Sequence, residues 1–177
     1  MAEKSVPSLG LLRQLLTLDE ATGLLYWRRR PLEMFTTSKA HRTWNTRYAR
    51  QEAFACTNAS GYKVSSIFDR KFYGHRVVFA MVHGRWPTVE IDHIDGDRGN
   101  NHPDNLREAT RQVNARNCAL GKDNTSGAKG VFWSCGKWRA TILKKSIGRF
   151  DTFDEAVVAR KAAERLHGFH PNHGRAV

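Results

Sequence analysis

One short run constrains this chain more than any other. An alternating strand pattern over residues 89–93 ends in Asp92-His93 and leads into a turn-rich loop. The loop (96–104) is dense in Gly, Asn, Asp and Pro, which favour turns and interrupt regular elements. A second short strand pattern follows at 106–109. The run therefore predicts two short strands joined by a long loop, with an acid and a titratable base ending the first strand.

Two amides follow this pair at set distances. Asn105 closes the loop, and Asn114 lies one turn into a helix that Thr110 can cap and that extends to about Asn117. Carboxylate, imidazole and amides thus occur in an order that suits one-metal hydrolysis of a phosphodiester. One group would hold a cation, one would activate water and one would orient the base. Single Asp-His pairs are common, so this prediction depends on the order and the spacing.

The charge of the chain is large and unevenly distributed. Its 177 residues carry a formal net charge of +12, with a pI near 10.1, which indicates a polyanionic partner. Residues 1–88 hold 14 Lys and Arg against 6 Asp and Glu, and residues 121–177 hold 11 against 5. Residues 89–120 hold 4 against 6. Solubility alone gives no reason for an acidic segment between basic flanks, so nucleic acid is the favoured partner.

The composition argues against several protein classes. A hydrophobic content of 40% argues against disorder, and no apolar run approaches the roughly 18 residues of a membrane span. The N-terminal segment lacks the order of a signal peptide. Cys56, Cys118 and Cys135 are widely spaced and odd in number, which indicates reduced thiols in a cytosol. His170 and His173 have no Cys or acid at ligand spacing, so no zinc is expected.

The N-terminal third combines regular elements with an irregular segment. Leucines at helical spacing predict a helix over 8–18, and 24–27 is a predicted strand. Residues 28–60 interleave basic and aromatic side chains with little periodicity. This pattern is typical of a nucleic-acid surface and equally of a loop-rich packing layer with a solvated rim. The DNA contacts expected from this segment are Arg28, Arg29, Arg30 and Arg47.

In the middle of the chain, a hairpin is predicted over 61–72 and an apolar helix over 75–82. The pattern of the C-terminal part predicts a small sheet covered by one helix. Its strand patterns lie at 129–134, 137–143 and 146–150, before a helix that a capping box opens at Thr152 and that continues to His167. One helix covers one face of such a sheet, so the other face is free to meet DNA. The inner face of the helix is expected to consist of Val158, Ala159, Ala162, Ala163 and Leu166.

The central residues resemble a known family, the HNH endonucleases of bacteriophages, in the homing-type branch where Asn replaces the final His. The resemblance covers 75–117 and is carried by His75-Arg76, Asp92-His93-Ile94-Asp95-Gly96, Asn101, Asn105-Leu106-Arg107 and Asn114. It implies that Asp92 and Asn114 hold one divalent cation. It also implies that His93 is the general base for the attacking water, and that Asn105 fixes its ring and tautomer. An amide at the last position suits a hard cation, so Mg²⁺ is expected, with Mn²⁺ or other divalent ions tolerated.

Residues 126–168 are similar to an ethylene-response-factor (APETALA-type) DNA-binding domain, which is commonly fused behind phage HNH modules. The motifs are Gly130-Val131, Lys137-Trp138-Arg139-Ala140, Gly148-Arg149-Phe150-Asp151 and the Ala-rich helix. The resemblance implies a sheet in the major groove, with contacts from Lys129, Phe132, Lys137, Arg139, Thr141 and Lys144. The plant family places several arginines on this face, whereas Phe132 and Ser134 occupy two of these places here. Part of the surface is therefore expected to bind phosphates only.

These observations predict an α+β protein with a ββα-metal (HNH) nuclease core and a C-terminal three-stranded antiparallel sheet packed on one helix. The expected divisions are a basic and aromatic region (1–60), a nuclease domain (61–117), a linker (118–127) and a DNA-binding domain (128–177). The expected function is a site-specific endonuclease of double-stranded DNA. It would act as a monomer or weak dimer in the cytoplasm of an infected bacterial host, without a membrane or small-molecule cofactor. The alternatives are a non-catalytic DNA-binding regulator with a degenerate HNH fold and an enzyme of structured RNA or branched DNA.

Overall fold

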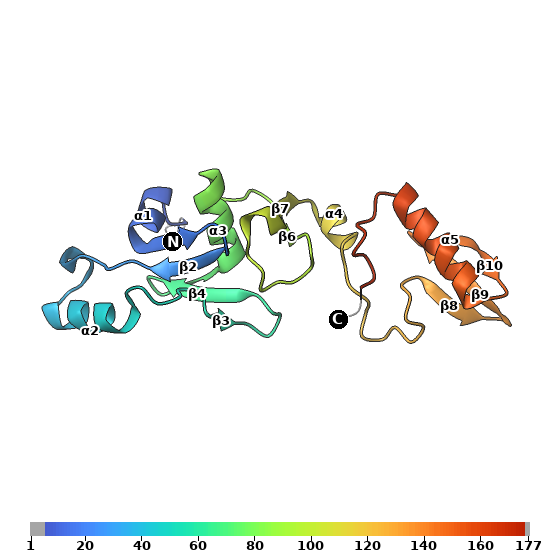
Figure 1. The fold of residues 1–177 in the computed structure, drawn as a ribbon, viewed down its shortest axis with the longest axis horizontal. Coiled ribbons are helices and arrows are strands. Elements are labelled where there is room, and N and C mark those ends of the chain that lie inside the picture. Colours follow the sequence, from blue (N-terminus) through green and yellow to red (C-terminus); the bar gives the residue numbers. More distant parts are fainter. Residues whose placement is uncertain (1–5, 176–177) are drawn as a thin grey trace, which may run out of the picture. The chain divides into compact units, whose positions relative to one another are not determined.

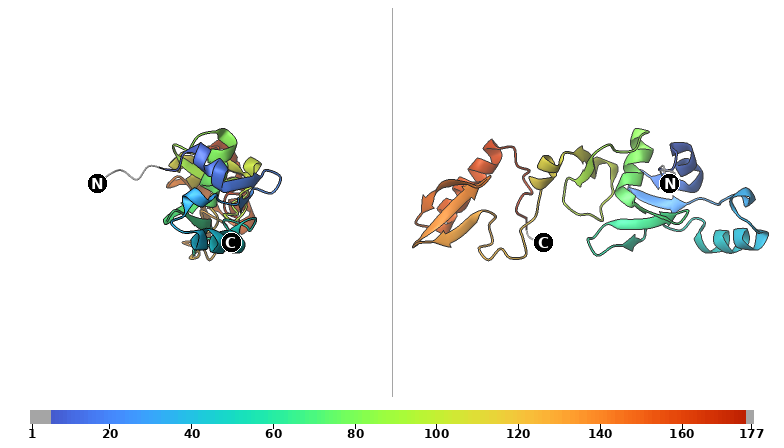
Figure 2. Two further views of the ribbon diagram at one scale, coloured as in Figure 1. Left: turned by 90° about the vertical axis from the view of Figure 1, so that its left-hand side faces the viewer. Right: turned by 180° about the vertical axis from the view of Figure 1, so that it is seen from behind.

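The computed structural model describes residues 6–175, and the chain divides into two compact units. Unit 1 ends at Glu108 and unit 2 begins at Ala109. Both combine helices with small sheets, which confirms the predicted mixed fold (Figures 1 and 2). Within the described range, no helix is long and apolar enough to cross a membrane.

Among its described residues, unit 1 contains three small sheets, formed by β1 with β2, by β3 to β5 and by β6 with β7. Its elements, the last of which extends one residue past the boundary, are α1 (Leu9–Leu15), β1 (Leu16–Asp19), β2 (Leu24–Trp27), η1 (Leu32–Met34), α2 (Ser38–Tyr48), β3 (Cys56–Thr57), β4 (Lys63–Ile67), β5 (Arg70–Tyr73), α3 (Gly74–His83), β6 (Glu90–His93), η2 (Pro103–Asn105) and β7 (Leu106–Ala109).

The first helix is shorter than its leucine pattern predicted. α1 begins after Ser8, whose hydroxyl accepts the Leu11 N–H, and it ends at Leu15. The following residues pair antiparallel with β2, so that Leu16 lies opposite Trp27. The leucine pattern continues from helix into strand, and both elements bury their leucines in the same core.

A helix that the sequence analysis did not predict, α2, lies in the irregular segment. It begins after Thr37, whose hydroxyl accepts the Ala40 N–H, and it buries only Asn45. The Asn45 side chain accepts the N–H of Arg30 and donates to the carbonyl oxygen of the same residue. Because the buried residue of this helix is polar, hydrophobic periodicity did not reveal it.

The predicted hairpin and apolar helix are confirmed as β4–β5 and α3. The two strands are antiparallel, with Ile67 opposite Arg70. The turn residues between them, Phe68 and Asp69, both have positive φ, 47° and 63°. This is the conformation of a type I′ hairpin turn, in which Asn and Gly are normally preferred. The helix α3 ends at Gly84, which has a φ of +66°.

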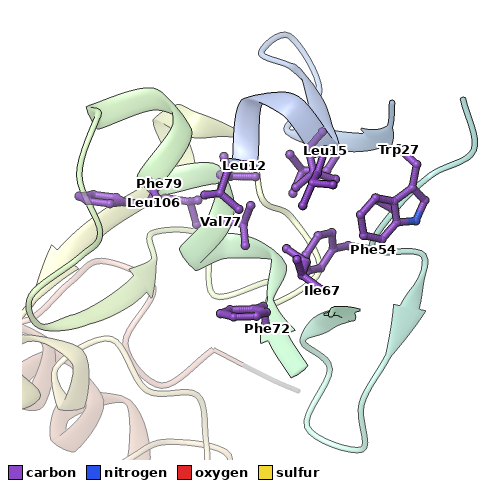
Figure 3. Close-up of a cluster of buried hydrophobic side chains, with 14 of the residues drawn as sticks. Leu12, Leu15, Trp27, Phe54, Ile67, Phe72, Val77, Phe79 and Leu106 are labelled. Carbon is purple, nitrogen blue, oxygen red and sulfur yellow. The ribbon is translucent and has the colours of Figure 1, made fainter. Parts of the chain in front are cut away.

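Unit 1 is built around one hydrophobic core (Figure 3). Leu15 of α1, Phe54, Ile67 of β4 and Val77 of α3 are all buried in it. The core therefore joins residues on both sides of the predicted boundary at residue 60. The N-terminal region packs on the elements that carry the Asp-His pair and forms one unit with them.

Unit 2 is a small sheet with one long helix. Strand β9 is central in the order β10-β9-β8, both pairings are antiparallel, and the helix packs on all three strands (Figure 1). The predicted capping box is confirmed, because Thr152 and Glu155 exchange side-chain to backbone hydrogen bonds. Its elements are α4 (Arg111–Ala115), β8 (Val131–Ser134), β9 (Lys137–Ile142), β10 (Lys145–Phe150) and α5 (Phe153–Leu166).

The predicted inner face of α5 is wrong for Val158, Ala162 and Leu166, which are exposed, whereas Ala159 and Ala163 are half-buried. Val158 and Leu166 are 66% and 83% exposed, whereas Ala156, Arg160 and Glu164 are buried. The Arg160 Nε donates to Glu164 Oε1 at 2.8 Å. An ion pair thus occupies the buried stripe of the helix, and a prediction that placed only apolar residues inward turned the helix to the wrong side.

Candidate active site

His93, the last residue of β6, is one of the most buried polar residues of unit 1. It is 3% exposed, and its Nε2 lies 3.1 Å from Asn101 Oδ1. Because an amide oxygen can only accept, this contact puts the ring proton on Nε2 and the lone pair on Nδ1. The rings of Tyr62 and His75 lie 5.9 and 5.1 Å from it, centroid to centroid. The contacts therefore fix both the orientation and the tautomer of the imidazole.

Asn101 is itself positioned by two glycines that are distant in sequence. Gly23, in the β1–β2 turn with φ +71°, is so close that a Cβ there would lie 2.3 Å from the Asn101 carbonyl oxygen. At Gly74, the first residue of α3, a Cβ would lie 2.8 Å from Asn101 Nδ2. Only residues without a side chain allow both approaches. The N-terminal hairpin thus helps to hold the amide that orients His93.

Asp92, beside His93 on β6, is buried and forms a salt bridge. Arg107 on β7 donates from Nε and Nη2 to the same carboxylate oxygen, Oδ2, at 3.0 and 2.7 Å. A buried carboxylate is costly without such compensation. The guanidinium therefore both stabilises the carboxylate and fixes its orientation.

Asn105 was predicted to fix the His93 ring, but its amide makes its hydrogen bonds within the loop. Its Nδ2 donates to Asp95 Oδ1 and to the Asn100 carbonyl oxygen, and its Oδ1 accepts the Asp95 N–H. Partial burial raises the pKa of Asp95, but hydrogen bonds from two Asn side chains and the Asp97 N–H outweigh it, so the net shift is downward. Asn105 holds the loop around an ionised Asp95, and its part in a reaction stays a prediction.

His75 is a second buried imidazole beside His93. Its ring lies 5.1 Å from the rings of His93 and Tyr62 and stacks on Tyr73 at 5.5 Å. Its Nδ1 has no hydrogen-bond partner among residues 6–175. Burial, with smaller effects of His93 and Arg76, lowers the pKa of His75 to about 3. The ring is therefore neutral near pH 7 and packs against His93 without adding a charge.

The two predicted cation ligands belong to different units. Asp92 lies in unit 1, whereas Asn114 lies on α4 in unit 2, one turn after the Thr110 cap that the sequence predicted. Their convergence on one ion stays a prediction. Within the described residues, no group of three or more His, Cys, Asp and Glu is arranged to hold a metal ion. The donor chemistry nevertheless fits a hard cation, because carboxylate and amide oxygens suit Mg²⁺.

Three of the four arginines predicted to contact DNA in the N-terminal region are exposed: Arg28, Arg29 and Arg47. The fourth, Arg30, is only 8% exposed, and its guanidinium lies 3.9 Å from the centroid of the Trp44 ring. Arg30 therefore differs from the other three in being enclosed by aromatic rings, and its contact with DNA stays a prediction. The segment combines an exposed basic rim with a packed aromatic layer.

In unit 2, one cross-strand row carries part of the predicted DNA surface. Phe132, Arg139 and Arg149 are direct neighbours on the three strands. Side chains alternate between the faces of a strand, and the adjacent Ala140 is buried against α5. The row therefore lies on the sheet face opposite the helix, where Phe132 is exposed.

The remaining predicted contacts of unit 2 are in different environments. Lys144 is exposed in the β9–β10 turn. Lys137 is exposed and pairs with Asp151 at 2.8 Å. Two others bond to backbone carbonyl oxygens within the unit: Lys129 Nζ to Ala119 and Thr141 Oγ1 to Gly130.

Sequence reasoning assigned no role to Asn101 or Arg107, the residues that contact the Asp-His pair. For Arg107 a signal existed, because two adjacent strands present side chains to a common face. The first strand ends in an acid, and the second places an arginine at its second residue. For Asn101 there was no local signal, since its position depends on the close approach of Gly23 and Gly74.

The Asp-His pair that ends β6, the turn-rich loop whose amide orients the imidazole and the return strand β7 follow the order that the sequence predicted. Comparison with known proteins agrees, because residues 72–116 match the family model described as HNH endonuclease.

Two relatives are viral. The chain is 48% identical over 71 residues to Protein 3.8 of Escherichia phage T7, which covers 38% of this chain and 59% of that protein. It is 36% identical over 91 residues to the uncharacterized HNH endonuclease L560 of Acanthamoeba polyphaga mimivirus, covering 50% of this chain and 46% of that one. The chain thus spans about half the length of the curated relatives it matches. No solved structure matches it significantly.

Proposed function

We propose that this chain is a site-specific DNA endonuclease of the phage homing type, which hydrolyses a phosphodiester with one divalent cation. The observation that carries the proposal is the buried His93 imidazole, which Asn101 orients and which adjoins the Asp92 carboxylate. A general base must be held in one orientation and one tautomer to accept a proton efficiently. The match of residues 72–116 to the HNH endonuclease model supports the same reaction class.

In this mechanism His93 takes the proton of the attacking water at Nδ1, since Nε2 carries its proton toward Asn101. The Asn101 oxygen remains an acceptor throughout, so it also stabilises the imidazolium that proton transfer creates. Asn105 keeps the loop that carries Asn101 in place through its bonds with Asp95. Asn101 and Asn105 thus act on the orientation or the charge of the His93 ring.

Asp92 and Asn114 are the residues that would hold the cation, and Arg107 keeps the Asp92 carboxylate oriented. When bound, a divalent cation stabilises the charge that develops on the phosphate and on the leaving oxygen. We assign DNA positioning to the exposed Arg28, Arg29 and Arg47, and to the APETALA-like face of unit 2. These contacts would be mainly to phosphates, which position a duplex without reading its sequence.

One observation favours a second candidate, a DNA-binding regulator without catalysis. Asp92 Oδ2 already accepts two hydrogen bonds from the Arg107 guanidinium. A permanent cation at this carboxylate competes electrostatically with a metal ion. A protein that kept the fold but lost the metal would retain such a salt bridge.

Nicking of a supercoiled plasmid that carries DNA of the genome encoding this protein separates the two candidates. The nuclease cuts with Mg²⁺ or Mn²⁺, and the His93→Ala variant loses about 10²–10⁴-fold in rate, the usual contribution of a positioned base. Binding of the same DNA in EDTA is expected to stay nearly unchanged in this variant.

His83→Ala is the matched control, because His83 is an exposed histidine of α3. It is expected to cut at the parent rate. Absence of cleavage by the parent with every divalent ion tested, together with intact DNA binding, would identify the regulator. Equal rates for the parent and His93→Ala would remove His93 from the mechanism.

A further inference from the structure

Unit 1 contains a hollow of about 530 Å³ outside the Asp-His site, which we call the aromatic pocket. Its size falls within the range of about 300–1,000 Å³ that is usual for ligand sites. It lies between β2, α2 and the β4–β5 turn, and Trp27, at its inner side, also belongs to the hydrophobic core (Figure 3). The other residues that matter for its chemistry are Arg30, Trp44, Tyr48, Phe68 and Asp69.

Arg30 is the most unusual residue of the aromatic pocket. Its guanidinium lies 3.9, 4.9 and 5.3 Å from the ring centroids of Trp44, Trp27 and Phe68. It forms no ion pair with a carboxylate among residues 6–175, and its buried Nε has no hydrogen-bond partner there. Burial lowers its pKa from the usual value. Ring faces compensate part of this charge, but the buried Nε–H donor remains unsatisfied, which is costly in a purely structural arginine.

Phe68 provides an independent observation. It occupies a left-handed backbone position with φ 47°, where a bulky side chain is rare and strained. Its ring is 48% exposed, so burial of the ring does not explain the strain. The turn does place this ring over Arg30 at the mouth of the pocket. An exposed ring that a strained turn holds over a buried cation is a candidate ligand contact.

The chemistry of the aromatic pocket fits a nucleobase better than a phosphate. Exposed Tyr48 and Phe68 offer ring faces on which any base can stack. The Arg30 donors suit base carbonyl oxygens and ring nitrogens, and the Asp69 carboxylate at the rim suits an amino group or ring N–H. That same carboxylate repels a phosphate, whereas stacking on the exposed rings is available only to a planar ligand such as a base.

We propose that the aromatic pocket receives one unpaired nucleobase of the DNA strand that this protein binds. The proposal rests on the proposed function only in taking DNA as the polymer. A base held here would be taken out of the stack, at a cost of unstacking that the pocket contacts offset. The pocket would thereby recognise distorted or single-stranded DNA and fix the register of the strand.

The test uses the full chain in EDTA, with single-stranded eight-nucleotide oligomers and abasic oligomers of the same length. We expect the parent to bind base-containing oligomers more tightly than abasic ones. Tyr48→Ala and Phe68→Gly should each weaken binding of the base-containing oligomer by about 5- to 150-fold, the usual effect of one lost stacking partner. Binding of the abasic oligomer should stay unchanged.

Two comparisons keep the result specific. Trp133→Ala removes a 56% exposed ring from unit 2 and should leave the preference for bases intact. His93→Ala should leave it intact as well, so failure of the nuclease proposal and failure of the pocket proposal give different results. Gly suits the backbone at position 68, and an unchanged melting temperature shows that a loss of binding is not a loss of folding.

Photocrosslinking locates the base directly. Oligomers with 5-iododeoxyuridine, irradiated on the full chain, should give adducts on Trp44, Tyr48 or Phe68. Adducts confined to Trp133, Trp138 or Phe132 would place base contacts in unit 2 and overturn the proposal. Equal weakening of base-containing and abasic oligomers by Phe68→Gly would also overturn it, because this would indicate a phosphate contact.

Discussion

Unit 1 and unit 2 are stabilised in different ways, although both combine helices with small sheets. Among residues 6–175, the buried hydrophobic cluster of unit 1 holds 15 residues and that of unit 2 holds three. Unit 1 buries the Asp92, His93 and His75 side chains beside its large core. We infer that a large apolar core can tolerate a buried polar site, whereas a small one must use polar contacts for its own stability.

The polar contacts of unit 2 converge on α5. Glu164 binds Arg160 at 2.8 Å and Lys161 at 3.0 Å, and His173 lies 4.0 Å away. The Arg160 Nη1 also donates to the carbonyl oxygen of Thr141 on β9. The Arg160–Glu164 pair thus connects the helix to the sheet through the guanidinium and to His173 of the C-terminal segment through the carboxylate.

The largest expected effect is a loss of stability in unit 1. Gly23→Ala places a Cβ 2.3 Å from the Asn101 carbonyl oxygen, at a φ of +71°. Both residues are buried, so we expect a loss of about 5 kcal/mol or more in the unfolding free energy of unit 1. Hydrogen exchange of the β4 and α3 amides measures it, while β9 amides should be unaffected.

Gly84→Ala is the matched control for this change. Gly84 has a similar φ of +66°, but no atom lies within 4 Å of its Cβ position. Only the left-handed backbone term remains, about 1–2 kcal/mol. Similar losses for both variants would show that the Asn101 loop moves aside and does not depend on Gly23.

Glu164→Gln tests whether the buried ion pair stabilises unit 2. It leaves Arg160 buried without a counter-charge, and breaking a buried pair costs about 3–5 kcal/mol. We expect faster hydrogen exchange at the β9 amides and unchanged exchange in α3. Asp154→Asn, an exposed acid in the first turn of the same helix, should cost less than about 1 kcal/mol. A small effect of Glu164→Gln would mean that apolar packing alone stabilises unit 2.

Acid should weaken both units through a buried histidine. Burial lowers the pKa of His75 to about 3 and, despite the opposing influence of Glu164, that of His173 to about 4. Both values lie below the ordinary 6.5, so the unfolded chain binds the extra proton first, and stability falls as the pH drops below about 6.5. Linkage gives a loss of about 2 kcal/mol per histidine between pH 7 and pH 5.

His75→Gln and His173→Gln isolate these contributions. Each variant should remove about that much of the pH dependence from its own unit and leave the other unit unchanged. Segment-resolved hydrogen exchange at pH 7 and pH 5, corrected for the intrinsic rates, provides the measurement. An unchanged pH dependence in His173→Gln would show that the ring takes up a proton in the folded unit as readily as in the unfolded chain.

The sequence predicted the elements that have a local signature. The capping box at Thr152, the Thr110 cap and the β4–β5 hairpin depend on neighbouring residues, and the structure confirms them. The predicted Asp-His pair likewise ends β6, and the predicted loop joins β6 to β7.

The contacts around the pair were harder to predict, because they depend on tertiary approach. Asn101 and Asn105 are chemically equivalent amides of one loop, and the close approach of Gly23 and Gly74 to Asn101 is a tertiary contact that places this amide beside His93. The α2 helix and the inner face of α5 were missed for a related reason. Buried polar groups, Asn45 and Arg160, stand where hydrophobic periodicity expects apolar ones.

The smallest expected effect concerns two hairpin turns of the same geometry, one in each unit. Phe68 and Leu143 occupy the first turn position of their hairpins, with φ values of 47° and 48°, and both side chains are about half exposed. Gly removes the left-handed strain of each but adds backbone entropy to the unfolded chain, so each variant should gain at most about 1 kcal/mol.

The two variants should differ in binding. Leu143→Gly should keep the preference for base-containing oligomers, whereas Phe68→Gly should lose it, because only Phe68 lies over a buried arginine. Melting curves and oligomer titrations on the same samples measure both effects. A gain in stability without a loss of binding at position 68 would mean that the strained phenylalanine serves neither folding nor the aromatic pocket. The strain in both turns would then reflect hairpin geometry alone.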